Sequence, residues 1–103
     1  MTDFDYQLID DLIHSRIRLA VMAALAALGP ASFSLIKEQI GATDGNLSVH
    51  LRKLEDGEYL HVDKSFIDRK PVSIYRLTPK GKVALKTYIE YLENLLPLNN
   101  PKG

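Results

Sequence analysis

The chain has 103 residues, of which 46% are hydrophobic and 25% charged, a composition typical of one ordinary globular domain. It contains no cysteine, which excludes disulfide bonds, thiolate metal sites and thiol-based redox sensing by this chain. Its 13 basic and 13 acidic residues cancel, so no overall positive charge attracts nucleic acid. Basic residues are nevertheless concentrated in residues 52–82, so a neutral chain can still present one basic face.

The amino-terminal residues are acidic rather than basic, which is not the pattern of a secretory signal peptide. The longest apolar run, residues 19–28, is about half of the ~20 residues that cross a bilayer. We therefore expect a cytoplasmic protein without a membrane partner.

The first predicted helix begins at Asp10 or Ser15 and ends at Leu28, because apolar residues recur through this stretch at helical spacing. The Gly-Pro pair at residues 29–30 ends it.

Two further helices follow, separated by a tight turn. The second begins near Ser34 and ends at Gly41, since glycine readily takes the left-handed conformation that closes a helix. The third begins at Thr43, whose side chain can cap a helix, and Asp44 suits the positive end of the helix dipole. Gly57 ends this third helix.

After the third helix the pattern changes from helical spacing to alternation. Residues 59–67 and 72–77 are rich in β-branched and aromatic residues, and the polar stretch Asp-Arg-Lys-Pro at 68–71 separates them. Two such runs around a short polar break predict a β-hairpin.

The last predicted helix, residues 79–96, begins with the Thr-Pro pair at 78–79 and precedes a tail of residues 97–103. Two apolar stripes run along it, and a small domain can cover only one. We expect the other stripe, with an amino-terminal extension of residues 1–9, to form a dimer interface. The residues of this predicted interface are Phe4, Tyr6, Leu8, Ile9, Leu85, Tyr88, Ile89, Leu92, Leu95 and Leu96. The alternative is one broad core-facing stripe with a few exposed tyrosines.

The order of elements, three helices, a hairpin wing and a last helix, predicts an α+β, mostly helical, winged helix-turn-helix fold. The chain resembles the small winged-helix transcriptional regulators related to the MarR and ArsR groups in three stretches: TDGNLSVHLRKLEDGEYL (43–60), DRKPVSIYRLTPKGK (68–82) and YIEYLENLL (88–96). The resemblance extends from His14 to Leu96. The length of the chain predicts a single domain over residues 1–103. The resemblance implies that this domain binds duplex DNA sequence-selectively as a homodimer, through its third helix and its wing.

The third helix has two different faces on a helical wheel. Leu47, Leu51 and Leu54 share the face that must pack on the first two helices, with His50 at its edge. Small and polar residues occupy the opposite face and the helix start. The candidate DNA-binding residues of this helix are Thr43, Asp44, Gly45, Asn46, Ser48, Val49, Arg52 and Lys53.

The small residues lie at the amino-terminal end of that outward face, which in a helix-turn-helix approaches the base edges of the major groove. Gly45 permits close approach of the backbone, and the exposed first amides suit a phosphate. Arg52 can contact guanine through two hydrogen bonds, and Val49 can touch a thymine methyl group. The alternative is ordinary helix-start chemistry on a solvated face.

Three basic residues, Lys64, Arg69 and Lys70, surround the predicted hairpin tip. A basic tip can enter a narrow minor groove or hold a phosphate. The alternative is a charged tip that only keeps the hairpin soluble. Asp68 stands where the resembled family often has glycine, and its carboxylate would face phosphate unfavourably.

The sequence predicts no enzyme, metal site or cofactor. The three histidines lie on different predicted elements without metal-ligand spacing, and Ser48 and His50 point away from each other on a helix. The competing hypothesis is a winged-helix module that binds another protein and has no DNA function. A small-molecule effector is compatible with the fold, but no residue pattern identifies one.

Overall fold

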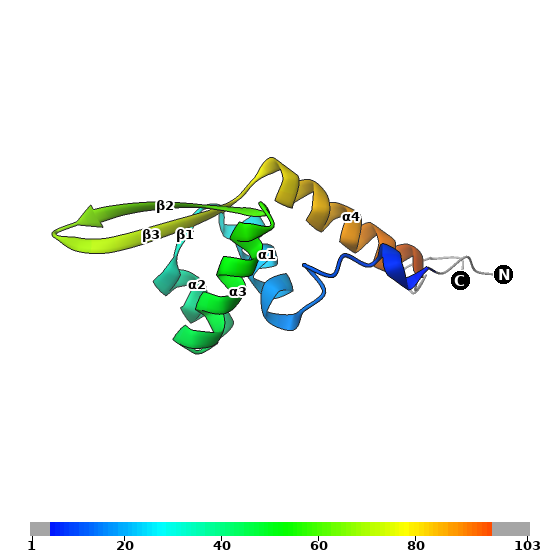
Figure 1. The fold of residues 1–103 in the computed structure, drawn as a ribbon, viewed down its shortest axis with the longest axis horizontal. Helices are drawn as coiled ribbons and strands as arrows, with labels where there is room; N and C mark the ends of the chain where they lie inside the picture. The colour runs from blue at the N-terminus through cyan, green and yellow to red at the C-terminus, as the bar shows by residue number, and fades with distance from the viewer. Residues whose placement is uncertain (1–4, 96–103) are drawn as a thin grey trace.

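A computed structural model describes residues 5–95 and shows three packed helices, a long β-hairpin that projects from them, and a last helix that extends in the opposite direction (Figure 1). The predicted winged helix-turn-helix is confirmed. Phe4, Leu96 and the predicted tail lie outside the described residues. The elements in chain order are η1 (Tyr6–Leu8), α1 (Arg16–Leu28), β1 (Ala31–Ser32), α2 (Phe33–Ile40), α3 (Asp44–Asp56), β2 (Leu60–Ile67), β3 (Lys70–Leu77) and α4 (Pro79–Leu95).

Local capping chemistry determines where α1 begins and ends. Ser15 is the N-cap, and its hydroxyl accepts a hydrogen bond from the backbone N–H of Arg18 at 3.4 Å. Asp10, the other predicted start, instead accepts from the backbone of Leu12 at 2.9 Å in the preceding turn. Gly29 ends the helix at φ 81°, as its position before a proline predicted.

The second helix begins at Phe33, one residue before the predicted start near Ser34, and Ser32 supplies its cap. The Ser32 hydroxyl accepts from the N–H of Leu35 at 3.1 Å. Gly41 closes the helix in the left-handed conformation at φ 77°, as expected. Ala31 and Ser32 also form a short strand, β1, which pairs antiparallel with Tyr75 and Ile74 of β3. Two residues are too few for a sequence pattern, so this third strand was missed.

The hairpin turn has two residues instead of the four expected. Asp68 and Arg69 occupy the turn with φ 51° and 67°, as in a type I′ turn, and Lys70 already pairs with Ile67. Pro71 lies inside β3, where a proline is accepted because β3 has only one neighbouring strand at that end.

The core lies where α1, α2, α3, the base of the hairpin and α4 meet. Leu47, Leu51 and Leu54 are buried, which confirms the predicted inward face of α3. The buried apolar residues are Ile13, Val21, Met22, Leu25, Ala31, Ile36, Leu47, Leu51, Leu54, Leu60, Leu77, Leu85 and Tyr88.

The buried side of α4 combines Leu85 from one predicted stripe with Tyr88 from the other. The stripes are Leu85, Ile89, Leu92 and Leu96, and Ala84, Tyr88, Tyr91 and Leu95. Leu85 and Tyr88, which we expected at a dimer interface, are buried in the core of the single chain and offer no surface to a second copy. Leu92 packs partly against the same core, whereas Ile89 is exposed. The boundary between core and surface therefore crosses both stripes, because packing on α1 and on the hairpin base decides which side of α4 faces the core.

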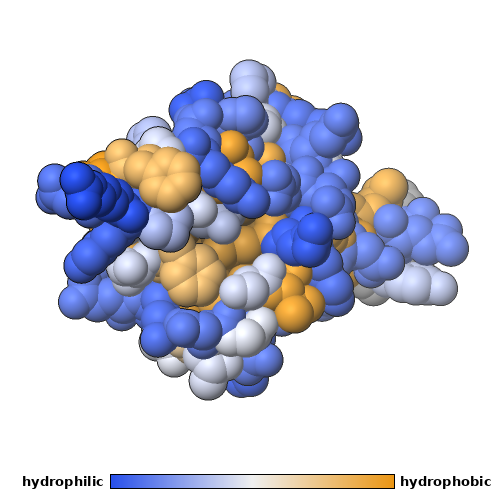
Figure 2. Space-filling view, turned by 60° about the vertical axis from the view of Figure 1, so that its left-hand side comes forward, coloured by the Kyte–Doolittle hydropathy of each residue, from blue (hydrophilic) through white to orange (hydrophobic). Residues whose placement is uncertain are grey.

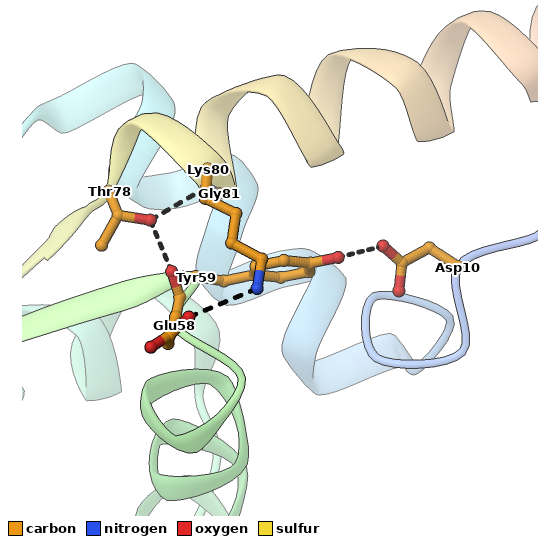
Figure 3. Close-up of polar contacts among 6 residues, drawn as sticks. All are labelled: Asp10, Glu58, Tyr59, Thr78, Lys80 and Gly81. Carbon is orange, nitrogen blue, oxygen red and sulfur yellow. Dashed lines mark hydrogen bonds and ion pairs between the residues drawn. The ribbon is translucent and has the colours of Figure 1, made fainter.

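The start of α4 is held against the end of α3 by a group of backbone contacts (Figure 3). Thr78 donates its hydroxyl to the carbonyl oxygen of Glu58 at 2.6 Å and accepts from the N–H of Gly81 at 2.9 Å. Gly81 is buried against the backbone of Tyr59, and a Cβ atom at residue 81 would overlap the Tyr59 carbonyl. Glycine is thus required here for a close approach of two backbones.

Gly81→Ala should lower the free energy of unfolding by ~1–3 kcal/mol, because the added methyl group overlaps backbone that cannot move aside easily. Gly45→Ala is the matched control in the first turn of α3, where a Cβ meets open space. It should leave stability unchanged or raise it by up to ~1 kcal/mol. Urea unfolding of both variants tests this, and equal effects would contradict the packing described for Gly81.

Candidate nucleic-acid interface

The turn between α2 and α3 positions the amino-terminal end of α3 at the surface. Gly41 reverses the chain in the left-handed conformation, and Thr43 then caps α3 by accepting from the N–H of Asn46 at 3.2 Å. Burial of the three leucines on the inner face directs the opposite face outward. The candidate residues on the outside, all exposed, are Thr43, Asp44, Gly45, Asn46, Ser48, Val49, Arg52 and Lys53.

Gly45 is not required by the packing of the chain itself. Its φ is not positive, and a Cβ built on it would meet no atom within 4 Å. Glycine in a helix is less favourable than alanine by about 1 kcal/mol. Gly45 therefore lowers the stability of the helix, and no packing contact in the chain requires it. What glycine does provide at this position is open space in front of the helix backbone.

Asp44 differs from the other candidates because its carboxylate already has a cationic partner. Lys37 of α2 lies 2.7 Å from it, with both side chains largely exposed. A surface pair of this kind adds little stability. It does offset a negative charge at the helix start, where an unpaired carboxylate would repel an approaching phosphate.

Behind α3, a half-buried arginine connects the helix to the segment before α1. Arg18 donates to the carbonyl oxygen of Leu12 and to Nδ1 of His50, the latter at 2.9 Å. Burial, followed by the charges of Arg18 and Lys53, holds the pKa of His50 below its ordinary value. His50 is therefore an acceptor at the core edge, as its wheel position suggested, but no sequence signal identified Arg18 as its partner 32 residues away.

The wing carries its cations at the tip and its paired charges nearer the base. Asp63 lies 2.6 Å from Arg76 and 3.0 Å from His61, and the hydrogen bond from His61 is the largest cause that lowers its pKa. Lys64, Arg69 and Lys70 are exposed towards the tip, and within residues 5–95 none of them makes an ion pair. Asp68 shares the turn with them and reduces their net charge.

At the other end of the molecule, the amino-terminal segment lies along the outer half of α4 (Figure 1). The hydroxyl of Tyr91 donates to the carbonyl oxygen of Asp5 at 2.7 Å, and His14 Nδ1 lies 2.8 Å from the hydroxyl of Tyr88. Tyr6 and Leu8 in this segment are exposed. We call this assembly of residues 5–9 and 88–95 the stalk.

Over residues 5–95, no group of three or more histidine, aspartate or glutamate side chains is placed to hold a metal ion. None of the helices described in that range is long and apolar enough to cross a membrane.

Comparison with known proteins supplies the family. A family model described as a winged helix DNA-binding domain matches residues 17–96. An uncharacterized protein of Methanocaldococcus jannaschii is 38% identical over 78 residues, or 76% of this chain and 85% of the relative. A transcriptional regulator homologue from Pyrococcus horikoshii OT3 superposes with a TM-score of 0.81 at 25% identity, over 91% of this chain and 94% of that one. A MarR-family transcriptional regulator structure from Enterococcus faecalis V583 superposes with a TM-score of 0.71 at 23% identity, over 94% of each chain, and shows the shared fold.

The lowered pKa of His50 predicts that the free energy of unfolding falls as the pH is lowered below about 6.5. The unfolded chain takes up a proton at about pH 6.5, before the folded chain does, so the contribution of His50 is complete above about pH 6.5 and is lost as pH falls through the folded pKa. His50→Gln keeps an acceptor for Arg18 but cannot titrate. The free energy of unfolding, measured in urea at about pH 7.5 and about pH 5, should fall less between these two pH values for this variant than for the wild type. Equal losses would contradict the assignment.

Proposed function

The chain belongs to the winged-helix DNA-binding domain family, a family of transcriptional regulators rather than enzymes, and we propose how it binds DNA. It binds duplex DNA as a homodimer. Each α3 enters the major groove of one half-site, and each wing contacts the neighbouring backbone or minor groove. The observation that carries this proposal is the open, small-residue start of α3 around Gly45.

The outward face of α3 has the chemistry that base recognition requires. Asn46 and Ser48 can donate and accept hydrogen bonds at short range, close to the helix start that Gly45 leaves uncovered. Arg52 lies further along the same face and reaches a guanine edge with two donors. Val49 is exposed between them and fits the methyl group of thymine. Lys53 is suited to a phosphate at the groove edge.

The wing contributes charge rather than base recognition in this arrangement. Lys64, Arg69 and Lys70 make no ion pair within the described residues, so their charges are available to phosphate, although Asp68 in the turn reduces their sum. The zero net charge of the chain is compatible with this role, since attraction depends on the local distribution of charge.

The stalk supports dimerisation. The amino-terminal segment and the outer half of α4 do not cover all of each other's apolar side chains. Tyr6, Leu8 and Ile89 remain exposed in the stalk. A second copy packed on this surface would bury them and would double the DNA contacted. The proposed interface comprises Tyr6, Leu8, Ile9, Ile89, Leu92 and Leu95, with Leu85 and Tyr88 supporting it from the core.

The helix and the wing should respond differently to mutation. Arg52→Ala should weaken binding to a selected duplex by ~1–3 kcal/mol per half-site and relax the preference at one base pair. Arg69→Ala should weaken binding to all sequences alike and lower the salt slope by about 1. Lys86→Ala removes an equal charge from α4, remote from the proposed DNA surface, and is the control for net charge.

These variants are titrated against selected and scrambled duplexes at several salt concentrations. If Arg52→Ala binds and discriminates as the wild type does, α3 is not the recognition helix. A module that binds another protein through the same fold would then be the better hypothesis.

Dimerisation should depend on the stalk and not on exposed apolar residues elsewhere. Leu8→Asp places a charge on the proposed interface, while Val83→Asp places the same charge on the inner half of α4, where Val83 is equally free of the core. Sedimentation equilibrium at micromolar concentration should show a dimer for the wild type and for Val83→Asp, and a monomer for Leu8→Asp. A monomeric wild type would contradict the proposal.

A further inference from the structure

The wing ends in apolar side chains that the chain does not cover. Phe66 is 75% exposed and Ile67 58% exposed, although both belong to residue types that are usually buried. The hairpin carries them well beyond the helices (Figure 1), and Figure 2 shows apolar surface on this end of the molecule surrounded by hydrophilic side chains.

The strand register places the two residues on opposite faces of the hairpin. Phe66 pairs with Pro71, and its face continues inward through Val62 to Leu60, which is buried on the helices. Ile67 pairs with Lys70 on the other face. The face that packs on the helical core at the base of the wing therefore carries the phenylalanine at its tip.

The turn beside Phe66 is held in a conformation that its sequence does not favour. Type I′ turns need positive φ at both central residues and usually have Asn-Gly. Aspartate tolerates this conformation at residue 68, but Arg69 at φ 67° adopts it without the freedom of glycine. Backbone of this kind is concentrated at binding sites, and here it places the cation of Arg69 in the turn at the tip of the wing.

We propose that Phe66 is a wedge that enters the minor groove and partly unstacks one base step beside the half-site contacted by α3. The proposal rests on the proposed DNA binding of the wing. Charge selects this occupant: Lys64 lies on the same face of the hairpin as Phe66, Lys70 lies on the opposite face, and Arg69 lies in the turn between the strands. Cations on both faces of the tip match the phosphates on both sides of a minor groove. Apolar side chains inserted in this way kink the duplex, so the wing would bend DNA as well as hold it.

The wedge predicts a sequence preference that a purely cationic wing would not have. Pyrimidine–purine steps such as TA unstack easily, whereas A-tracts are stiff and have the narrow groove that attracts arginine alone. Wild-type protein should therefore bind a duplex with TA at the wing position several-fold more tightly than one with AA.

The test uses the full chain and a duplex that the wild type selects from a random pool, with 2-aminopurine placed in turn at each position flanking the half-site. Unstacking makes this base fluoresce. Phe66→Ala should lose the fluorescence increase and the TA preference, and should bind about ten-fold more weakly, which corresponds to ~1.4 kcal/mol. Its salt slope should not change. Phe66→Leu should retain part of each signal, because leucine is also an apolar wedge.

Ile67→Ala is the matched control, because it removes an exposed apolar side chain from the same tip on the opposite face. It should behave as the wild type. If Phe66→Ala binds the selected duplex with the affinity, fluorescence increase and TA preference of the wild type, the wedge is overturned but the proposed DNA binding is not.

Two other outcomes also overturn it. Loss of the solution dimer by Phe66→Ala would assign the tip to a protein interface instead. Failure of the wild type to select any duplex would overturn the proposed function together with the wedge.

Discussion

The arrangement of the molecule depends on the burial of one face of α3 against the other helices. Leu47, Leu51 and Leu54 are almost completely removed from solvent. Truncating one such residue typically costs ~2–5 kcal/mol, a large part of the stability of a small domain. This burial leaves α3 no freedom to rotate about its axis. The outward position of Gly45 and Arg52 is therefore a consequence of core packing.

A second group of contacts connects this core to the wing and to the stalk. The Tyr59 carbonyl accepts from the N–H of Thr78 at 3.0 Å, which closes the base of the hairpin, and the Tyr59 hydroxyl donates to Asp10 in the amino-terminal segment (Figure 3). Burial, and then the contact with Asp10, raises the pKa of Tyr59 to about 12, so this hydroxyl remains a donor at neutral pH. One residue thus touches the start of the wing, the start of α4 and the segment that runs along the stalk.

That connection would give the proposed dimerisation and the proposed DNA contacts a shared structural basis. A second copy packed on the stalk would fix residues 5–9 and the outer half of α4, and the contacts around Tyr59 would carry this constraint to the wing. The angle between the two wings of a dimer would then be set at the stalk. A bent duplex, as the Phe66 wedge implies, requires such a defined angle.

The features that could be predicted from sequence are those decided by neighbouring residues. Thr43 and Gly41 set the ends of helices through local capping chemistry, so these positions were correct, and the leucine spacing identified the inward face of α3. The core side of α4 was not predictable, because both of its stripes are apolar and only packing on distant elements distinguishes them. The contact between Arg18 and His50 joins residues far apart in sequence and has no local signal. The two-residue turn was missed because Asp68 and Arg69 lack the glycine that marks such turns.

We propose that the small residues at the start of α3 allow its backbone to approach DNA closely and do not serve the stability of the fold. The most direct measurement compares Gly45→Ala and Gly45→Leu with the wild type in two assays, urea unfolding and titration of the selected duplex. Stability should be equal to or above that of the wild type for both variants, because a Cβ atom at residue 45 meets no atom of the described residues within 4 Å and both side chains favour a helix more than glycine does. Affinity for the selected duplex should fall with side-chain size, and specific binding should be absent for leucine. A Gly45→Leu variant that binds the selected duplex as tightly as the wild type would contradict the account.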